Sequence, residues 1–287
     1  MPDMNMELEE LKQRLNCDGY IADDSLALSL YLAEKLGRPL LVEGPAGVGK
    51  TEAAKAAARA FGRELVRLQC YEGLDETKAL YEWNYQKQLL AIQTGAGEDM
   101  SSLFSDEYLL ERPLLKAVNS EEPVVLLIDE IDKADSEFEA FLLEMLGEMQ
   151  VTIPEYGTIR AKSTPFVVLT GNRTRPLSEA LRRRCAYLYI DFPNIERESQ
   201  ILMARLPGLS EHLAKQVSRA VAYLRESGRL IKRPSIAEAI DWAAALQALG
   251  SDGLDDETCV KTIGFCLKND EDIEETLRDD DFIRTIL

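Results

Sequence analysis

The segment Gly44-Pro45-Ala46-Gly47-Val48-Gly49-Lys50-Thr51 constrains the fold of this chain more than any other part of the sequence. It matches the pattern G-x-x-x-x-G-K-[ST] and lies between a short apolar run at residues 39–42 and an alanine-rich stretch at residues 51–61. Glycines allow the backbone to turn tightly, so that successive N–H groups and the positive end of the following helix converge on phosphate oxygens. A glycine-rich turn without a nucleotide is the alternative, but the strand and helix on either side favour a phosphate-binding loop.

Two residues of this loop predict that it binds a nucleoside triphosphate together with magnesium. Lys50 is expected to reach the β- and γ-phosphates as a mobile point charge. The hydroxyl of Thr51 is expected to complete the coordination of Mg²⁺.

Polar residues follow two further apolar runs. The run at residues 124–128 ends in Asp129-Glu130, and the run at residues 166–170 is followed by Gly171-Asn172. In open α/β sheets ligands bind at the carboxyl ends of the strands. We therefore expect Asp129 to hold magnesium, Glu130 to polarise the attacking water, and Asn172 to orient that water through its amide. The implied reaction is hydrolysis, because a kinase would gain nothing from a water-activating glutamate.

The order of apolar and helical segments predicts an α/β fold of the P-loop type. Five short strands are expected at residues 39–42, 64–68, 124–128, 166–170 and 186–190, separated by helical stretches. This alternation indicates a five-stranded parallel sheet sandwiched by helices. Beyond Pro193 only helical periodicity remains. We therefore expect a large nucleotide-binding domain at residues 1–192 and a smaller all-α lid domain at residues 193–287.

Composition narrows the partners and the compartment. The net charge of −18 and the pI near 4.6 argue against a surface that neutralises nucleic acid. No apolar run is long enough to span a membrane, and the start of the chain is acidic and amphipathic, unlike a signal peptide. The five cysteines have no C-x-x-C pair and fit small buried hydrophobes in a reducing compartment. A cytoplasmic protein without a zinc site is expected, and the acidic stretch at residues 271–281 is expected to be a solvated face.

Taken together, these motifs resemble those of the AAA+ ATPases. GPAGVGKT, VVLLIDEID and LTGN look like Walker A, Walker B and sensor 1, and Lys232-Arg233-Pro234-Ser235 resembles sensor 2. The resemblance implies that Arg233 contacts the phosphate from the lid, so that nucleotide state sets the angle between the domains. It also implies assembly into a ring, with a hexamer as the expected size.

Within that family the sequence is similar to the MoxR branch. The stretch LLEMLGEMQVTIPEYGTIRAKSTPFVVLTGN matches its β-hairpin before sensor 1, and RCAYLYIDFP and RPSIAEAIDWA place it near the CoxD-like subgroup. This resemblance implies a chaperone that remodels a client metalloenzyme, such as a molybdenum-containing carbon monoxide dehydrogenase. It also implies a partner with a von Willebrand factor A domain.

An arginine finger is expected in the segment Leu181-Arg182-Arg183-Arg184-Cys185. Many MoxR proteins have Asp-Arg-Phe where this chain has Arg-Arg-Cys, so the alignment favours Arg184 first and Arg183 second. Such a finger would stabilise charge on the γ-phosphate of a neighbouring subunit. The alternative is that the arginines complement the dipole at the end of a helix.

Two weaker assignments follow from the same resemblance. Tyr20-Ile21 lies where AAA+ proteins form the adenine pocket, although a hydrophobic staple at a helix start explains the pair equally well. Tyr71-Glu72-Gly73 follows the second strand, where unfoldases carry a pore loop. The aromatic residues Tyr81, Trp83 and Tyr85 are expected to serve packing.

Two other functions remain open at this stage. One is a nucleotide-gated switch that binds a partner without mechanical work, although the guanine motif Asn-Lys-x-Asp is absent from the sequence. The other is a nucleic-acid motor such as a helicase loader, against which the charge balance argues.

Overall fold

The computed structural model describes residues 4–17, 19–94, 103–154 and 156–286. The chain divides into two compact units. The first comprises Met1–Arg14, Asp23–Glu43 and Thr51–Tyr189, and the second comprises Leu15–Ala22, Gly44–Lys50 and Ile190–Leu287. Among the described helices, none has both the length and the apolar character that crossing a membrane requires.

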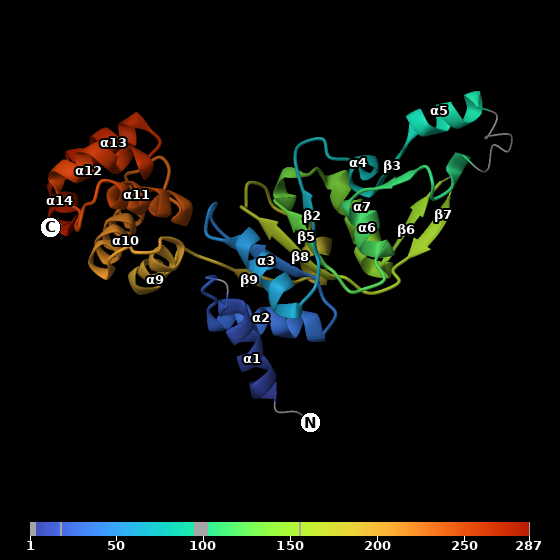
Figure 1. The fold of residues 1–287 in the computed structure, drawn as a ribbon, viewed down its shortest axis with the longest axis horizontal. Coiled ribbons are helices and arrows are strands. Elements are labelled where there is room, and N and C mark those ends of the chain that lie inside the picture. The colour runs from blue at the N-terminus through green and yellow to red at the C-terminus, as the bar shows by residue number, and fades with distance from the viewer. Residues whose placement is uncertain (1–3, 18, 95–102, 155, 287) are drawn as a thin grey trace. The chain divides into compact units, whose positions relative to one another are not determined.

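The first unit is built on a five-stranded parallel sheet (Figure 1). Its strand order is β2-β5-β8-β1-β9. The strands are β1 (Leu40–Glu43), β2 (Leu65–Gln69), β5 (Val125–Asp129), β8 (Phe166–Gly171) and β9 (Ala186–Tyr189). Every neighbouring pair is parallel. The five-stranded sheet flanked by helices that the sequence predicted is confirmed, with boundaries shifted by one or two residues.

Burial explains the sequence of each strand. All residues of β1, β5 and β8 are buried, as expected for strands covered on both faces, and they are aliphatic along most of their length. By contrast β2, at one edge of the sheet, alternates between buried and exposed residues. Its exposed positions carry Arg67 and Gln69, which are therefore available to the polar carboxyl edge of the sheet.

Helices and two small antiparallel sheets of two strands each make up the rest of the described chain before Ile190. The sheets are β3 (Tyr81–Trp83) with β4 (Leu109–Glu111), and the hairpin β6 (Gln150–Ile153) with β7 (Gly157–Arg160). The helices are α1 (Met4–Asn16), α2 (Asp24–Lys35), α3 (Lys50–Phe61), α4 (Glu76–Leu80), α5 (Tyr85–Gln93), α6 (Pro113–Asn119), the 3₁₀ turn η2 (Ile131–Lys133), α7 (Ser136–Glu148) and α8 (Glu179–Arg184).

The expectation that the aromatic residues after β2 serve packing holds for two of three. Trp83 is buried and packs edge-on against Tyr81, with ring centroids 5.9 Å apart. Tyr85 lies on α5 with its side chain exposed, so the packing interpretation is wrong for this residue.

Beyond Ile190 the chain is helical. The elements are α9 (Ile195–Arg205), α10 (Glu211–Glu226), α11 (Ile236–Ala248), α12 (Asp256–Thr262), the 3₁₀ turn η3 (Ile263–Phe265), α13 (Asp270–Leu277) and α14 (Asp280–Ile286). Their core contains Trp242, fully buried, whose indole N–H donates to the Thr262 hydroxyl at 2.8 Å.

One expectation for this region holds only in part. Glu271, Glu274 and Glu275 are exposed, as predicted for a solvated face. Asp272, within the acidic stretch at residues 271–281, is buried rather than solvated. Its carboxylate accepts hydrogen bonds from the backbone N–H groups of Ile231 and Lys232, at 2.8 and 3.3 Å. An acid in a strongly acidic stretch can still be buried where it accepts hydrogen bonds from the backbone of a distant loop.

Sheet topology brings the predicted polar residues to one edge. The strands β5, β8 and β1 are adjacent, and all three run in the same direction. In register, Gln69 of β2 pairs with Asp129 of β5, and Glu43 of β1 pairs with Gly171 of β8. The carboxyl ends of four strands therefore meet along one line of the first unit.

Candidate functional site

The glycine-rich loop has the backbone that its sequence requires. Gly47 and Gly49 have φ angles of +74° and +92°, in the region that L-amino acids with a side chain rarely adopt. A Cβ atom on Gly44 would lie 2.0 Å from the carbonyl oxygen of Ile190, so only glycine fits this close approach. Lys50 is buried, and its Nζ donates to the carbonyl oxygens of Gly44 and Pro45 at 2.8 and 2.6 Å.

Within the second unit this loop meets the start of α11. Ser235 caps α11 in a capping box with Glu238, and a Cβ atom on Gly47 would lie 2.4 Å from the Ser235 Cβ. The N–H of Ile236 donates to the carbonyl oxygen of Gly47 at 3.3 Å. Arg233 lies exposed two residues before Ser235. The residues that resemble sensor 2 are therefore followed directly by a helix start that contacts the glycine-rich loop.

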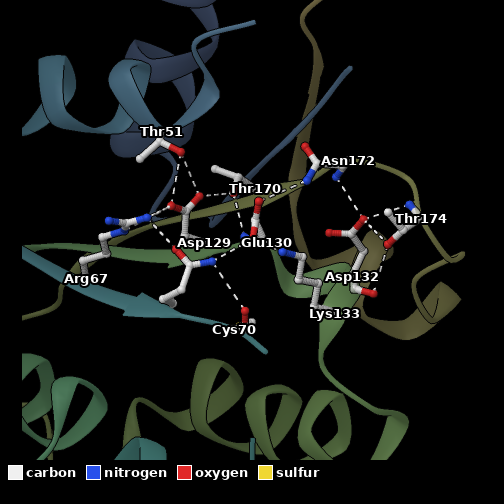
Figure 2. Close-up of polar contacts among 11 residues, drawn as sticks. Thr51, Arg67, Cys70, Asp129, Glu130, Asp132, Lys133, Thr170, Asn172 and Thr174 are labelled. Atoms are coloured by element: carbon white, nitrogen blue, oxygen red, sulfur yellow. Dashed lines mark hydrogen bonds and ion pairs between the residues drawn. The ribbon is translucent and has the colours of Figure 1, made fainter. Parts of the chain in front are cut away.

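Asp129 is the buried centre of the polar edge in the first unit (Figure 2). The Thr51 hydroxyl donates to its carboxylate, with distances of 3.0 and 3.2 Å to the two oxygens. Thr170 donates to Oδ1 at 2.5 Å, and Arg67 donates to Oδ2 from Nε and Nη2 at 3.1 and 2.6 Å. The structure thus brings Thr51 and Asp129 together, as the sequence predicted for a shared magnesium ion.

Glu130 follows Asp129 in a left-handed conformation, with φ of 57° and ψ of 49°. Its N–H donates to the Thr170 hydroxyl at 2.9 Å. Its carboxylate accepts from the side-chain amides of Gln69 and Asn172 at 2.8 and 3.3 Å, and pairs with Lys133 at 2.6 Å (Figure 2). The hydrogen bond to Glu130 raises the pKa of Lys133. Glu130 and Asn172 are therefore within hydrogen-bond reach of one another.

The thiol nearest this edge is not a nucleophile. Cys70 is buried, and its backbone N–H donates to the carbonyl oxygen of Asp129 at 2.8 Å. Burial, followed by the charge of Asp129, raises the pKa of the Cys70 thiol to about 12. This raised pKa disfavours the thiolate near neutral pH, so Cys70 fits a small buried hydrophobe rather than a nucleophile.

The residues present fit magnesium shared with a phosphate chain. Mg²⁺ prefers hard oxygen ligands and usually takes only one or two from protein, keeping waters and phosphate oxygens for the rest. The adjacent Thr51 hydroxyl and Asp129 carboxylate supply such a pair. Over the described ranges no cluster of three or more His, Cys, Asp or Glu residues has the geometry to hold a metal by itself.

The three arginines at the end of α8 have different partners. Arg184 donates to the carbonyl oxygen of Leu143 in α7, and its guanidinium lies against Gly147. Arg183 is paired at 2.5 Å with Glu179, four residues earlier, and both side chains are about three-quarters exposed. Arg182 lies 3.9 Å from the buried Glu43 and over the ring of Tyr187. Of the two residues aligned with a finger, both exposed, Arg183 pairs within its own helix whereas Arg184 is bonded to the backbone of α7.

The residues likened to an adenine pocket and to a pore loop lie in different units of the chain. Tyr20 and Ile21 are half-buried, and the Ile21 carbonyl oxygen accepts from the guanidinium of Arg197 in α9 at 2.8 Å. Tyr71, in the segment likened to a pore loop, has an exposed side chain. It lies in the first unit, whereas Tyr20 and Ile21 lie in the second.

Sequence reasoning did not identify several polar residues of this edge: Arg67, Gln69, Asp132, Lys133 and Thr170. The signal for the first two was present, because both lie on the polar face of an alternating strand. Thr170 precedes the predicted Gly171-Asn172 turn and has the same hydroxyl chemistry as Thr51. The contacts of Arg67, Gln69 and Thr170 with Asp129 and Glu130 depend on strand order, which the periodicity of the sequence does not specify.

A family model decides which group of proteins this site belongs to. The AAA domain of the dynein-related subfamily matches residues 39–185, which include the glycine-rich loop, Asp129-Glu130 and Asn172. The chain belongs to the dynein-related AAA domain family. This AAA protein is thus a nucleotide-binding protein of the P-loop class.

Curated relatives extend the match beyond the AAA domain. The chain is 29% identical over 249 residues to the uncharacterized protein YojN of Bacillus subtilis (strain 168), covering 84% of this chain and 74% of that protein. It is 26% identical over 251 residues to an uncharacterized protein of Staphylococcus aureus (strain USA300), covering 83% of this chain and 84% of that one. Both alignments therefore include a large part of the helical region.

Solved structures agree on the fold. Two mutants of RuvB from Thermotoga maritima superpose on this AAA protein with TM-scores of 0.51 and 0.50, at 20% and 21% identity. The alignments cover 84% and 83% of this chain and 67% of each RuvB chain. At this identity the similarity concerns the fold alone.

Proposed function

We propose that this AAA protein hydrolyses ATP. The observation that carries the proposal is the arrangement at the sheet edge, where Thr51 hydrogen-bonds Asp129 and the next residue, Glu130, lies within 3.3 Å of Asn172. The glycine-rich loop and Lys50 would bind the phosphates, and Tyr20 and Ile21 would flank the base. Magnesium, held by Thr51 and Asp129, would supply charge neutralisation for the phosphates.

Glu130 would act as the general base. Its carboxylate accepts a proton from a water that Asn172 orients, and the water oxygen bonds to the γ-phosphorus as the bond to the bridging oxygen of ADP breaks. The products are ADP and inorganic phosphate. In the structure the carboxylate is held by Gln69, Asn172 and Lys133, and these contacts keep it at the edge of the sheet.

Steady-state phosphate release with Mg²⁺ and ATP tests this proposal. Glu130→Gln keeps the shape of the side chain but removes the base, so turnover should fall roughly 10²- to 10⁴-fold while nucleotide binding is retained. Glu137→Gln, at an exposed position in the first turn of α7, is the matched control and should turn over like the wild type. Wild-type protein without turnover, or Glu130→Gln with full turnover, would refute the assignment.

We infer further that the chain is a chaperone of the MoxR branch that acts as a ring. Support comes from the sequence resemblance, from the β6–β7 hairpin directly before β8, and from the exposure of Arg183 on the surface of the chain. Arg184 or Arg183 would then complete the neighbour's site, and Arg233 would act from a lid domain at residues 193–287. Sedimentation with ATP should show an oligomer, with a hexamer as the expected size.

The proposed client is a metalloenzyme, such as a molybdenum-containing carbon monoxide dehydrogenase, in the cytoplasm. The proposed partner carries a von Willebrand factor A domain. A pull-down using Glu130→Gln in ATP should retain such proteins in a nucleotide-dependent way. Slow turnover with tight one-to-one binding of a partner would instead support a switch, and a salt-dependent gel shift would support a nucleic-acid motor.

A further inference from the structure

The carboxylate of Asp132 binds the backbone on both sides of Arg173. Its Oδ2 accepts from the N–H of Asn172 at 3.0 Å, and from the N–H and hydroxyl of Thr174 at 2.8 and 2.7 Å (Figure 2). Asp132 lies in the η2 turn and is 3% exposed. One buried oxygen therefore gathers three donors from the segment that follows β8.

The segment held in this way has an unusual backbone. Arg173 has a φ angle of +61°, a left-handed conformation that a residue with a side chain adopts only when its surroundings enforce it. The two N–H groups that flank it converge on a single anionic oxygen, which is the geometry of an anion-binding nest. The Arg173 side chain is anchored as well, since its Nε donates to the buried Glu43 at 3.0 Å and its guanidinium stacks over Tyr189.

This clamp sets the place of Asn172. The Asn172 amide reaches Glu130 Oε1 at 3.3 Å, and Glu130 is only two residues from Asp132 across the η2 turn. The same short turn therefore carries both the base and the residue that fixes its polar neighbour. We propose that Asp132 is a positioning residue that holds Asn172 against Glu130 by accepting these hydrogen bonds, and that its contribution is geometric rather than electrostatic. This inference rests on the proposed hydrolysis of ATP.

The contacts of the two Asp132 carboxylate oxygens allow the geometric contribution to be separated from the electrostatic one. All three donors bind Oδ2, whereas Oδ1 is buried without a hydrogen-bond donor among the described residues. Asp132→Asn can keep its oxygen at the position of Oδ2 and place its amide nitrogen at the position of Oδ1, so the three bonds persist while the charge is lost. Asp132→Ala loses both the bonds and the charge.

The test compares kcat and KM for ATP in these variants. Asp132→Ala should lower kcat about ten- to hundredfold, the range expected when a reacting group is misplaced by about 1 Å, with KM changed much less. Asp132→Asn should retain most of the wild-type kcat. Because Asp132 acts through Asn172, adding Asp132→Ala to Asn172→Ala should lower kcat no further. Asp135→Ala, at an exposed acid three residues along the chain that caps α7, is the matched control and should keep the wild-type kcat.

A second measurement does not depend on turnover. Hydrogen exchange of the peptide around residues 171–176 should accelerate in Asp132→Ala and stay at the wild-type rate in Asp132→Asn. Thr174→Val removes one of the three bonds and should give an intermediate exchange rate, which keeps the test open if Asp132→Ala fails to fold.

Three results would overturn the inference: kcat in Asp132→Asn as low as in Asp132→Ala, multiplicative losses in the double variant, or unchanged exchange in Asp132→Ala. Absence of turnover in the wild type is a different failure, because it removes the proposed function itself. Wild-type turnover that Glu130→Gln abolishes and Asp132→Ala leaves intact would refute the positioning role alone.

Discussion

Two buried carboxylates, Asp129 in the first unit and Glu198 in the second, each pair with an arginine, but the two arginines differ in exposure. Glu198 and Arg225 are 0% and 5% exposed and form two parallel hydrogen bonds of 2.8 Å. Asp129 is 2% exposed, but its cationic partner Arg67 is 45% exposed. The two carboxylates are about equally buried. The arginines differ, because the half-exposed Arg67 can be replaced by solvent or by another cation more readily than the buried Arg225.

The surroundings of each pair show what this difference means. The Nε–H of Arg225 donates to the carbonyl oxygen of Pro234 at 2.8 Å, and its guanidinium stacks on Phe192. This pair ties α9 and α10 to the loop before α11. Asp129 instead faces two hydroxyls and an arginine at the sheet edge. Burial of a carboxylate therefore does not mark a functional site by itself, and the two pairs differ in the exposure of the arginine.

The largest expected effect comes from breaking the enclosed pair. Arg225→Met leaves Glu198 buried without its cation and should lower the free energy of unfolding by about 3–5 kcal/mol. The chain has two tryptophans, Trp83 in the first unit and Trp242 in the second. Urea denaturation in a Trp83→Phe background, followed by fluorescence, therefore reports on the unit that contains the pair.

Two controls sharpen this prediction. Arg67→Met removes the partner of the other buried carboxylate, in the first unit, and is therefore followed through Trp83 in a Trp242→Phe background. It should cost about 1 kcal/mol or less, since half-exposed pairs contribute little. The double variant Glu198→Leu with Arg225→Met should recover most of the lost stability, because an apolar pair leaves no buried charge. Equal destabilisation by the two single arginine variants would remove the contrast between the regions.

A smaller effect is expected on the requirement for magnesium. The Arg67 guanidinium occupies Asp129 Oδ2 and so competes with a cation for this carboxylate. In Arg67→Met the Mg²⁺ concentration for half-maximal ATP hydrolysis should fall by up to about fivefold, the equivalent of about 1 kcal/mol for a partly exposed pair. Arg63→Met is the matched control, because Arg63 pairs with Glu34 at 2.7 Å and not with the sheet edge. A higher magnesium requirement in Arg67→Met would contradict the competition.

The smallest effect concerns acid stability. Burial by itself raises the pKa of Asp132, but the hydrogen bonds from Thr174 and Asn172 outweigh it and lower the pKa below its ordinary value of 3.8. A lowered pKa in the folded state stabilises the fold above pH 3.8, and this stabilisation disappears as the pH falls through the folded-state pKa. The difference in unfolding free energy between wild type and Asp132→Asn should therefore shrink below that pH. A difference that stays constant or grows on acidification would show that the pKa is not lowered.

Much of the fold was predictable because its signals are local. The strands β5 and β8 are apolar along most of their length. The helix α3 is rich in alanine and ends just before Gly62, which has a left-handed backbone conformation. The glycine-rich loop was predictable for the same reason, since its positive φ angles and its close backbone approach require glycine at defined positions. Residues placed by such local demands, including Thr51 and Asp129, can be predicted from the sequence to lie close together, and they do.

The partners of these residues depend on long-range pairing. Arg67 meets Asp129 because β2 pairs with β5, and Asp132 meets Thr174 because β8 lies beside β5. Asp272 shows the same limit, because the two N–H groups that it accepts from are about 40 residues away. The periodicity of a sequence predicts which face of a helix or strand is polar. It does not predict which distant part of the chain that face will contact.

Calorimetric titration with a non-hydrolysable ATP analogue tests the central claim most directly. The wild type should bind one nucleotide per chain, more tightly with Mg²⁺ than without. Lys50→Ala should bind roughly ten- to hundredfold more weakly, because charged hydrogen bonds contribute about 1.5–3 kcal/mol. Lys55→Ala, at a half-exposed position on the same helix, should bind like the wild type. No binding by the wild type, or equal binding by Lys50→Ala, would contradict the account.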